Sequence, residues 1–168
     1  MNHRLQQRRP DQFRVMVVID EIYAQKTVIE YVHQEGYRVS GFGDFKEAVR
    51  AFGHEPAHLV IADLTRPQLH AAEMVSALKR HSEAMVAVAI VSKLPTVEEQ
   101  AEDAFEGYLV KPLVRENIAD QLHELLLSPH AKHKPSILVL DDDVDSLMAA
   151  EHSLKVRGFE VVTFTNTG

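Results

Sequence analysis

Short apolar runs alternate with longer stretches of helical periodicity along most of the chain. Strands are expected in five of these runs, namely Val15–Ile19, Tyr37–Phe42, His58–Ala62, Val86–Val91 and Tyr108–Val110. The first run is unbroken and rich in β-branched residues, which is typical of a strand covered on both faces. This alternation predicts βαβ units and a parallel sheet.

The helices between these strands are indicated by apolar residues that recur every three or four positions. They are expected over Ile22–Gln34, from Asp44, over Leu69–Arg80, from Thr96 and over Val114–Leu127, with Ala72, Val75, Leu78, Val97, Val114 and Ile118 among the residues facing inward. The pairs Asp44–Glu47 and Thr96–Glu99 have the spacing of capping boxes. Five strand–helix pairs predict a complete (βα)5 α/β domain over residues 15–127, preceded by a flexible N-terminus over residues 1–14.

The opening pattern returns near the end of the chain. Residues 128–135 are polar and contain two prolines, so they are interpreted as a linker. An ungapped shift of 122 residues then relates Asp20 to Asp142 and Gly36 to Gly158. We therefore expect residues 136–168 to be the truncated start of a second copy, a partial β-α-β that stops after its second strand.

Composition and charge exclude several classes of protein. The 168 residues are 45% hydrophobic and 26% charged, the balance of a soluble globular protein. The net charge of −7 argues against direct binding of nucleic acid through the overall field. The apolar runs are far shorter than the roughly 20 residues of a membrane span. With no cysteine in the chain, a cytoplasmic location is the natural expectation.

Chemically active side chains follow four of the predicted strands. Strand one is followed by Asp20, strand three by Asp63, strand four by Ser92 and strand five by Lys111. In a doubly wound parallel sheet, ligands bind outside the carboxyl ends of the strands. Two carboxylates, a hydroxyl and an ammonium at that edge predict a site for a hard divalent cation and a phosphoryl group.

With these residues in place, the chain resembles the two-component response-regulator receiver family over nearly all of residues 15–127. The segments that carry the resemblance are Val17–Glu21, His58–Pro67, Ile90–Ser92 and Tyr108–Pro112, in this order and each at the end of a strand. The resemblance implies a flavodoxin-like sheet with strand order 2-1-3-4-5. It also implies a signalling module within a tandem-receiver protein, one that at most catalyses its own phosphorylation and dephosphorylation.

The resemblance assigns a role to each residue of the candidate site. Asp63 would be the phosphoacceptor, and Asp20, Asp63 and the backbone carbonyl of Thr65 would bind Mg²⁺. Lys111 would pair with Asp63 and then with the phosphoryl oxygens. The Ser92 hydroxyl would bind the phosphoryl group after transfer. Independently of the family, formation of an acyl phosphate requires a carboxylate nucleophile and positive charge near the transferring oxygens.

Further implications concern switching and partners. Ser92 and Tyr108 would form the switch pair, and the Lys111–Pro112 bond would be cis. Asp141 and Asp142 would be the acidic pair of the second receiver, although as a group they also fit a solvated charge run. The partner would be a sensor histidine kinase or a phosphotransfer protein, and the resemblance allows a homodimer.

The chain departs from the family pattern at three places. Ile19 stands where the family has the first of two adjacent acids, so Mg²⁺ binding is expected to be weak. Gln68–His70 replaces a turn that usually contains glycine, and the segment from Ser92 to Lys111 is shorter than usual. These departures support an alternative, a degenerate receiver that acts as a phosphorylation-independent protein-interaction module.

Two further alternatives have less support. A phosphohydrolase with an aspartyl nucleophile would usually have a second aspartate two residues after Asp63, where this chain has Thr65. His130 and His133 have the spacing of metal ligands, but no acid lies near them in the predicted linker.

Overall fold

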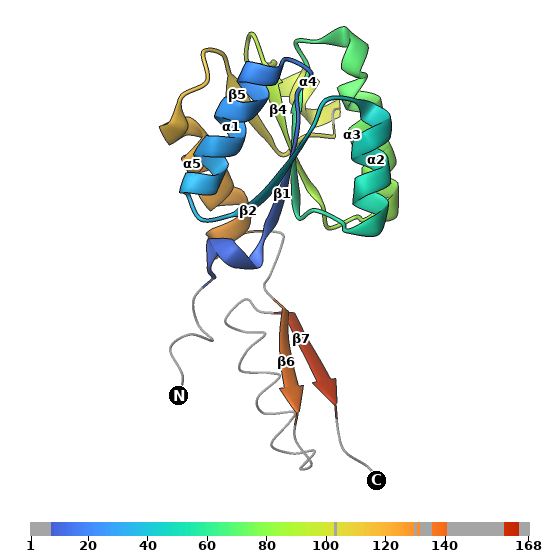
Figure 1. The fold of residues 1–168 in the computed structure, drawn as a ribbon, viewed down its shortest axis with the longest axis vertical. Coiled ribbons are helices and arrows are strands. Elements are labelled where there is room, and N and C mark those ends of the chain that lie inside the picture. Colours follow the sequence, from blue (N-terminus) through green and yellow to red (C-terminus); the bar gives the residue numbers. More distant parts are fainter. Residues whose placement is uncertain (1–7, 103, 130, 132–135, 141–159, 165–168) are drawn as a thin grey trace. The chain divides into compact units, whose positions relative to one another are not determined.

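The computed structural model describes residues 8–102, 104–129, 131, 136–140 and 160–164. The chain divides into two compact units, of which the larger spans Pro10–His133. Its elements are η2 (Pro10–Gln12), β1 (Arg14–Val18), α1 (Ile22–Gln34), β2 (Arg38–Phe42), α2 (Phe45–His54), β3 (Leu59–Asp63), η3 (Pro67–Leu69), α3 (Ala71–His81), β4 (Val86–Val91), α4 (Val97–Glu102), β5 (Gly107–Val110), α5 (Arg115–Leu122) and η4 (His123–Leu127) (Figure 1).

The five strands of this unit form one parallel sheet in the order β2-β1-β3-β4-β5. This is the predicted order of the (βα)5 doubly wound fold, so the fold class is confirmed. The order reverses between β1 and β3, which places the ligand-binding crevice of such folds at the carboxyl ends of these two strands. No helix in the described residues has the length and apolar character needed to cross a membrane.

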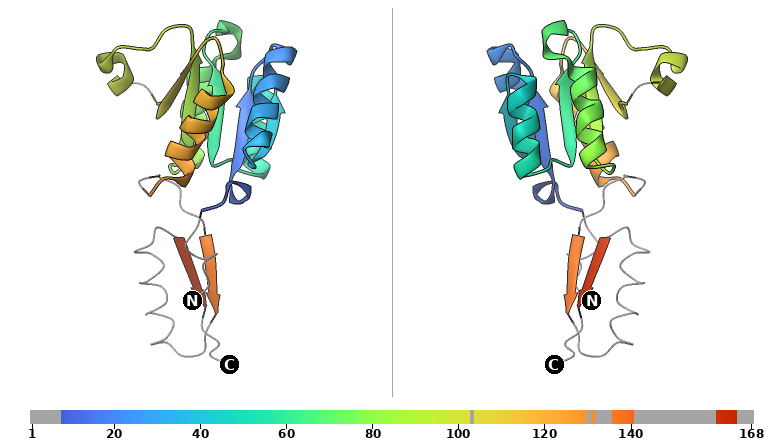
Figure 2. Two further views of the ribbon diagram at one scale, coloured as in Figure 1. Left: turned by 90° about the vertical axis from the view of Figure 1, so that its left-hand side faces the viewer. Right: turned by 90° about the vertical axis from the view of Figure 1, so that its right-hand side faces the viewer.

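Helices cover both faces of the sheet. Helices α1 and α5 lie on one face, and α2 and α3 on the other (Figures 1 and 2). Side chains alternate between the faces, as expected for a strand. On β1, Val15 and Val17 pack in the cluster with α1 and α5, whereas Met16 and Val18 pack in the cluster with α2 and α3.

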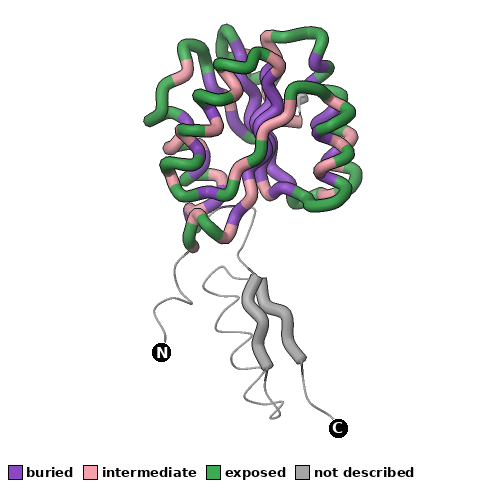
Figure 3. The backbone as a smooth tube through the Cα atoms, in the orientation of Figure 1, coloured by how far each residue is buried: buried purple, intermediate pink, exposed green. Residues whose placement is uncertain are grey.

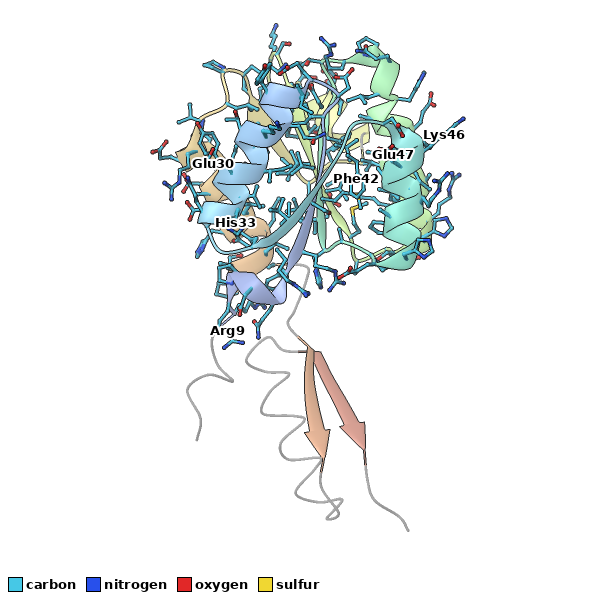
Figure 4. All side chains as sticks on the ribbon, viewed as in Figure 1. Arg9, Glu30, His33, Phe42, Lys46 and Glu47 are labelled. Carbon is cyan, nitrogen blue, oxygen red and sulfur yellow. The ribbon has the colours of Figure 1, made fainter. Side chains whose placement is uncertain are left out.

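Burial explains which strands were visible as unbroken apolar runs. Every residue of β3 and β4 is buried, because these strands have a neighbour on each side and helices on both faces (Figure 3). The edge strand β2 is only partly buried. The outer sides of the helices are polar, as at Glu30 and His33 on α1 and at Lys46 and Glu47 on α2 (Figure 4).

The third and fourth helices differ from the prediction. A 3-10 turn, η3, precedes α3, and His70 between them adopts a left-handed conformation with φ of 49°. The helix therefore begins at Ala71, which is buried, and Ala72 is exposed rather than inward as predicted. Val97 was also expected to face inward but is 83% exposed at the start of the six-residue α4.

The ends of the domain also differ. Folding starts before the predicted boundary at Val15, since Pro10–Gln12 form η2 and Phe13 is completely buried. At the other end Val114 is an exposed N-cap of α5 rather than an inward residue, and the helix continues as the π-helical turn η4. Ser128 closes this turn, because its backbone N–H donates to the carbonyl of His123.

The smaller unit contains β6 (Ser136–Leu140) and β7 (Glu160–Phe164), which pair in parallel. Ile137 pairs with Val161, as Val15 pairs with Val39 in the larger unit. The strand pairing thus has the same shift of 122 residues as the sequence repeat. Asp141 and Asp142, the segment between the two strands, and His130 and His133 lie outside the described residues.

Candidate functional site

The predicted site residues lie at the carboxyl edge of the sheet, the edge away from η2 (Figure 1). Asp63 is the last residue of β3, and Ser92 and Lys111 directly follow β4 and β5. Asp20 lies in the loop between β1 and α1. Because the strands are parallel and adjacent, their ends bring together residues that are far apart in sequence.

Asp63 is held in a defined orientation. Its Oδ1 accepts hydrogen bonds from the Thr65 backbone N–H (2.9 Å) and from the Thr65 hydroxyl (2.6 Å). The Lys111 ammonium lies 3.7 Å from Asp63 Oδ2 and donates to the Thr65 hydroxyl at 2.8 Å. One oxygen of the buried carboxylate is thus fixed by Thr65, while the other faces the positive charge of Lys111.

The backbone around Lys111 positions this ammonium. The backbone N–H of Lys111 donates to the carbonyl of Val91 at 3.0 Å, and this hydrogen bond joins the end of β5 to the end of β4. The peptide bond between Lys111 and Pro112 is cis, as the resemblance implied. The Lys111 side chain is about half exposed, whereas that of Asp63 is almost completely buried.

Asp20 is engaged by two side chains from the loop that follows Asp63. Arg66 Nε donates to Asp20 Oδ1 at 3.0 Å, and Gln68 Nε2 donates to Asp20 Oδ2 at 2.6 Å. Both carboxylate oxygens therefore already have donors. These two contacts link the start of the β1–α1 loop to the segment between β3 and η3.

The two residues beside Asp20 have structural roles. The Ile19 side chain is completely buried in the cluster against α1 and α5, and its backbone carbonyl accepts a hydrogen bond from Gln25 Nε2 at 2.8 Å. Glu21 caps α1, because its carboxylate accepts from the N–H groups of Tyr23 and Ala24. Glu21 therefore serves as a helix cap and does not replace the missing acid.

Both predicted switch residues lie outside the Asp63 network: Ser92 follows β4 at this edge, whereas Tyr108 is the second residue of β5 and pairs with Ala89. Ser92 is exposed, and within the described residues the hydrogen bonds to the Asp63 carboxylate come from Thr65 and not from the Ser92 hydroxyl. Tyr108 on β5 is partly buried and packs against the cluster with α2 and α3.

In this arrangement the site does not fit a divalent cation. Mg²⁺ usually binds one or two carboxylates and keeps several waters. Here each oxygen of Asp20 already accepts a hydrogen bond, one of them from the cationic Arg66 guanidinium, and Ile19 provides no second acid. Across the described part of the chain, no group of three or more His, Asp or Glu side chains is placed to hold a metal.

Two features of this site were missed by sequence reasoning. The first is the Thr65 hydroxyl, which links Asp63 to Lys111. The sequence analysis had proposed only the backbone carbonyl of Thr65 for the site. The partners of Asp20 were also missed, although Arg66 and Gln68 follow strand three at the same edge of the sheet. Their position in sequence placed a cation and an amide at this edge, but it did not show that they pair with Asp20.

Comparisons with known proteins agree with the fold described above. The family profile of the response regulator receiver domain matches residues 15–123. Among solved structures, the chemotaxis protein CheY4 of Vibrio cholerae is similar with a TM-score of 0.62 and 23% identity, over 68% of this chain and 98% of that chain. A CheY-like receiver domain protein from Methanospirillum hungatei has a TM-score of 0.60 and 17% identity, over 68% and 93%.

NtrX from Brucella abortus is similar over a smaller share of its own length. Its TM-score is 0.60 at 18% identity, and the likeness covers 67% of this chain and 25% of that chain. At these identities the likenesses show the fold alone. A search of curated proteins by sequence found no match.

Proposed function

The chain belongs to the response regulator receiver domain family, and on that basis we propose that it accepts a phosphoryl group on Asp63. The donor would be the phosphohistidine of a sensor histidine kinase or of a phosphotransfer protein. Receiver domains are in general the phosphoacceptor modules of two-component signalling, and membership of the family supports this general role.

The observation that carries the proposal is the asymmetry around the Asp63 carboxylate. Thr65 donates two hydrogen bonds to Oδ1, while Oδ2 lies 3.7 Å from the Lys111 ammonium. Such an arrangement favours Oδ2 as the nucleophile and Lys111 as the group that receives negative charge from the phosphoryl oxygens.

The transfer would proceed as follows. Asp63 Oδ2 forms a bond to phosphorus as the P–N bond of the donor phosphohistidine breaks, and the electron pair of that bond returns to the histidine ring nitrogen. Lys111 stabilises the charge on the phosphoryl oxygens during the transfer, and Thr65 holds Oδ1 out of the way. The product is an acyl phosphate on Asp63. The Ser92 hydroxyl would then bind the phosphoryl group.

Labelling with acetyl phosphate tests this proposal. With MgCl2 in large excess, intact-protein mass spectrometry should show the gain of one phosphoryl group. Asp63→Asn should abolish the gain, and Asp120→Asn, which changes an exposed carboxylate on α5, should leave it unchanged. An Asp63→Asn protein that labels like the parent would show that the acceptor is another residue.

The runner-up function is a receiver that binds partners without phosphorylation. It is favoured by the buried Ile19 and by the engagement of both Asp20 oxygens. Titration with beryllofluoride, a phosphoryl mimic, in excess MgCl2 separates the two functions. Saturable shifts of the Asp63 and Lys111 amide resonances support phosphorylation, and their absence together with no acetyl phosphate labelling supports the runner-up.

We also propose that residues 136–168 are the start of a second receiver. The support is the shared shift of 122 residues, which relates the β6–β7 pairing to the β1–β2 pairing. On this proposal Asp141 and Asp142 would form the acidic pair that the first receiver lacks at Ile19.

A further inference from the structure

We propose that the Arg66 guanidinium is the resident cation of the acidic edge, and that it excludes Mg²⁺ for as long as it is paired with Asp20. The carboxyl edge of this receiver is then closed by a side chain of its own chain. A divalent cation binds at Asp20 only after Arg66 has left it.

The first argument is occupancy. Arg66 Nε and Gln68 Nε2 donate to different oxygens of Asp20, at 3.0 and 2.6 Å. Each donor takes one of the two lone pairs of its oxygen, so Mg²⁺ at Asp20 Oδ1 must displace the Arg66 N–H or bind directly beside a positively charged guanidinium. The Asp20 side chain is only 19% exposed, which leaves few other directions of approach.

The second argument is charge. The two carboxylates of this network, Asp20 and Asp63, have formal charges that the Arg66 guanidinium and the Lys111 ammonium balance. A divalent cation added to these four side chains would therefore meet no excess of negative charge. Removal of Arg66 leaves the negative charge of the partly buried Asp20 uncompensated, which favours binding of a cation there.

The third argument is the position of Arg66 in the chain. It directly follows Thr65, whose backbone N–H and hydroxyl both bind Asp63. The segment from Thr65 to Gln68 therefore contacts Asp63 at one end and Asp20 at the other. Release of Arg66 would free the part of this segment that lies across the end of β1.

A Mg²⁺ titration of the full chain, followed by the amide resonances of Asp20 and Thr65, tests the proposal. Arg66→Ala should raise the affinity for Mg²⁺ by about five- to tenfold, since it removes both a competing donor and a like charge. Arg66→Lys should give a smaller rise, because it keeps the charge but loses the Nε–H donor. Gln68→Ala should also give a smaller rise, because Arg66 remains.

Arg80→Ala is the matched control. It removes one exposed arginine from the last turn of α3, which the βα connection returns to the opposite edge of the sheet. We expect its Mg²⁺ affinity to equal that of the parent. Equal affinities for Arg66→Ala and Arg80→Ala in folded proteins, verified by circular dichroism, would overturn the proposal.

A second variant locates the ion. Asp20→Asn combined with Arg66→Ala should lose the gained affinity, because the released carboxylate is then absent. If the gain persists in this double variant, the ion binds elsewhere and Arg66 does not guard Asp20. These titrations measure metal binding and not phosphorylation, so their outcome is separate from that of Asp63 labelling.

Discussion

Ile19 is stable at its position because its surroundings are apolar. It is completely buried and continues the face of Val15 and Val17 in the cluster against α1 and α5. The β1–β3 register pairs Val18 with Ala62, and one further step places Ile19 beside Asp63. Because Ile19 is apolar, Asp63 is the one carboxylate paired with Lys111, and no further acid adds negative charge beside it.

Ile19→Asp should therefore weaken the fold in the absence of metal. The buried, uncompensated carboxylate beside Asp63 is expected to lower the free energy of unfolding by about 3–5 kcal/mol. Mg²⁺ should restore part of this loss, because the added carboxylate gives the site an excess of negative charge with which the ion can displace Arg66 from Asp20. The measurement is the melting temperature with and without MgCl2.

Ile19→Asn is the control for this prediction. It introduces a polar group of similar size without charge, so it should destabilise the fold with little recovery in MgCl2. A melting temperature of Ile19→Asp that does not respond to Mg²⁺ would show that the absent acid alone does not limit metal binding while Arg66 remains paired with Asp20.

Asp63 and Lys111 could be placed from the sequence because each is a charged residue that directly follows an apolar run predicted to be a strand. The partners of Asp20 were a different problem. Arg66 and Gln68 lie 46 and 48 residues from Asp20 in sequence. Which loop side chains meet across two strand ends is decided by tertiary geometry, and periodicity contains no information about it.

At the scale of elements, the central strands were the most predictable part of the molecule. The bounds of β4 agree with the prediction, and those of β3 differ by one residue, because two-sided burial requires an unbroken apolar run. Short or irregular elements were less predictable. With six residues, α4 is too short for a helical period to identify its inner face. The turn η3 delays the start of α3 and leaves Ala72 exposed, whereas Val75 and Leu78 are buried as predicted.

Close packing between β2 and α1 yields a prediction at this scale. A Cβ added at Gly41 would overlap Ile29 Cδ1 and would lie 2.9 Å from Gln25 Oε1. Both atoms end side chains that can move, but moving Gln25 breaks its hydrogen bond to the Ile19 carbonyl, so Gly41→Ala should destabilise the domain by about 1 kcal/mol. Chemical denaturation with urea measures this change.

Gly53→Ala is the matched control, since it adds the same methyl group within α2. A Cβ at Gly53 would meet nothing within 4 Å, and alanine is the better helix former. We expect this variant to gain about 0.5–1 kcal/mol. Similar effects of the two substitutions would show that α1 and β2 are not closely packed at Gly41.

At the scale of the whole molecule, the chain contains one five-stranded receiver domain and a separate strand pair, β6–β7, that repeats the β1–β2 pairing. The register of β6 with β7 matches that of β1 with β2, residue for residue, after a shift of 122. In the larger unit β1 has a second neighbour, β3, on its other side. Within the described residues β6 pairs only with β7, so each strand of this sheet is an edge.

Hydrogen exchange should therefore divide the molecule into parts of different stability. A two-stranded sheet is marginally stable in water, so amides of β6 and β7 should exchange well before those of β4, which has a neighbour on each side. The edge strand β2 is the control, because it also pairs on one side but packs on a complete domain. We expect intermediate protection there.

The measurement is hydrogen exchange followed by mass spectrometry at several protein concentrations. Protection of β6 equal to that of β4 at the lowest concentration would contradict the prediction, whereas protection that rises with concentration would show that a second chain stabilises this strand pair.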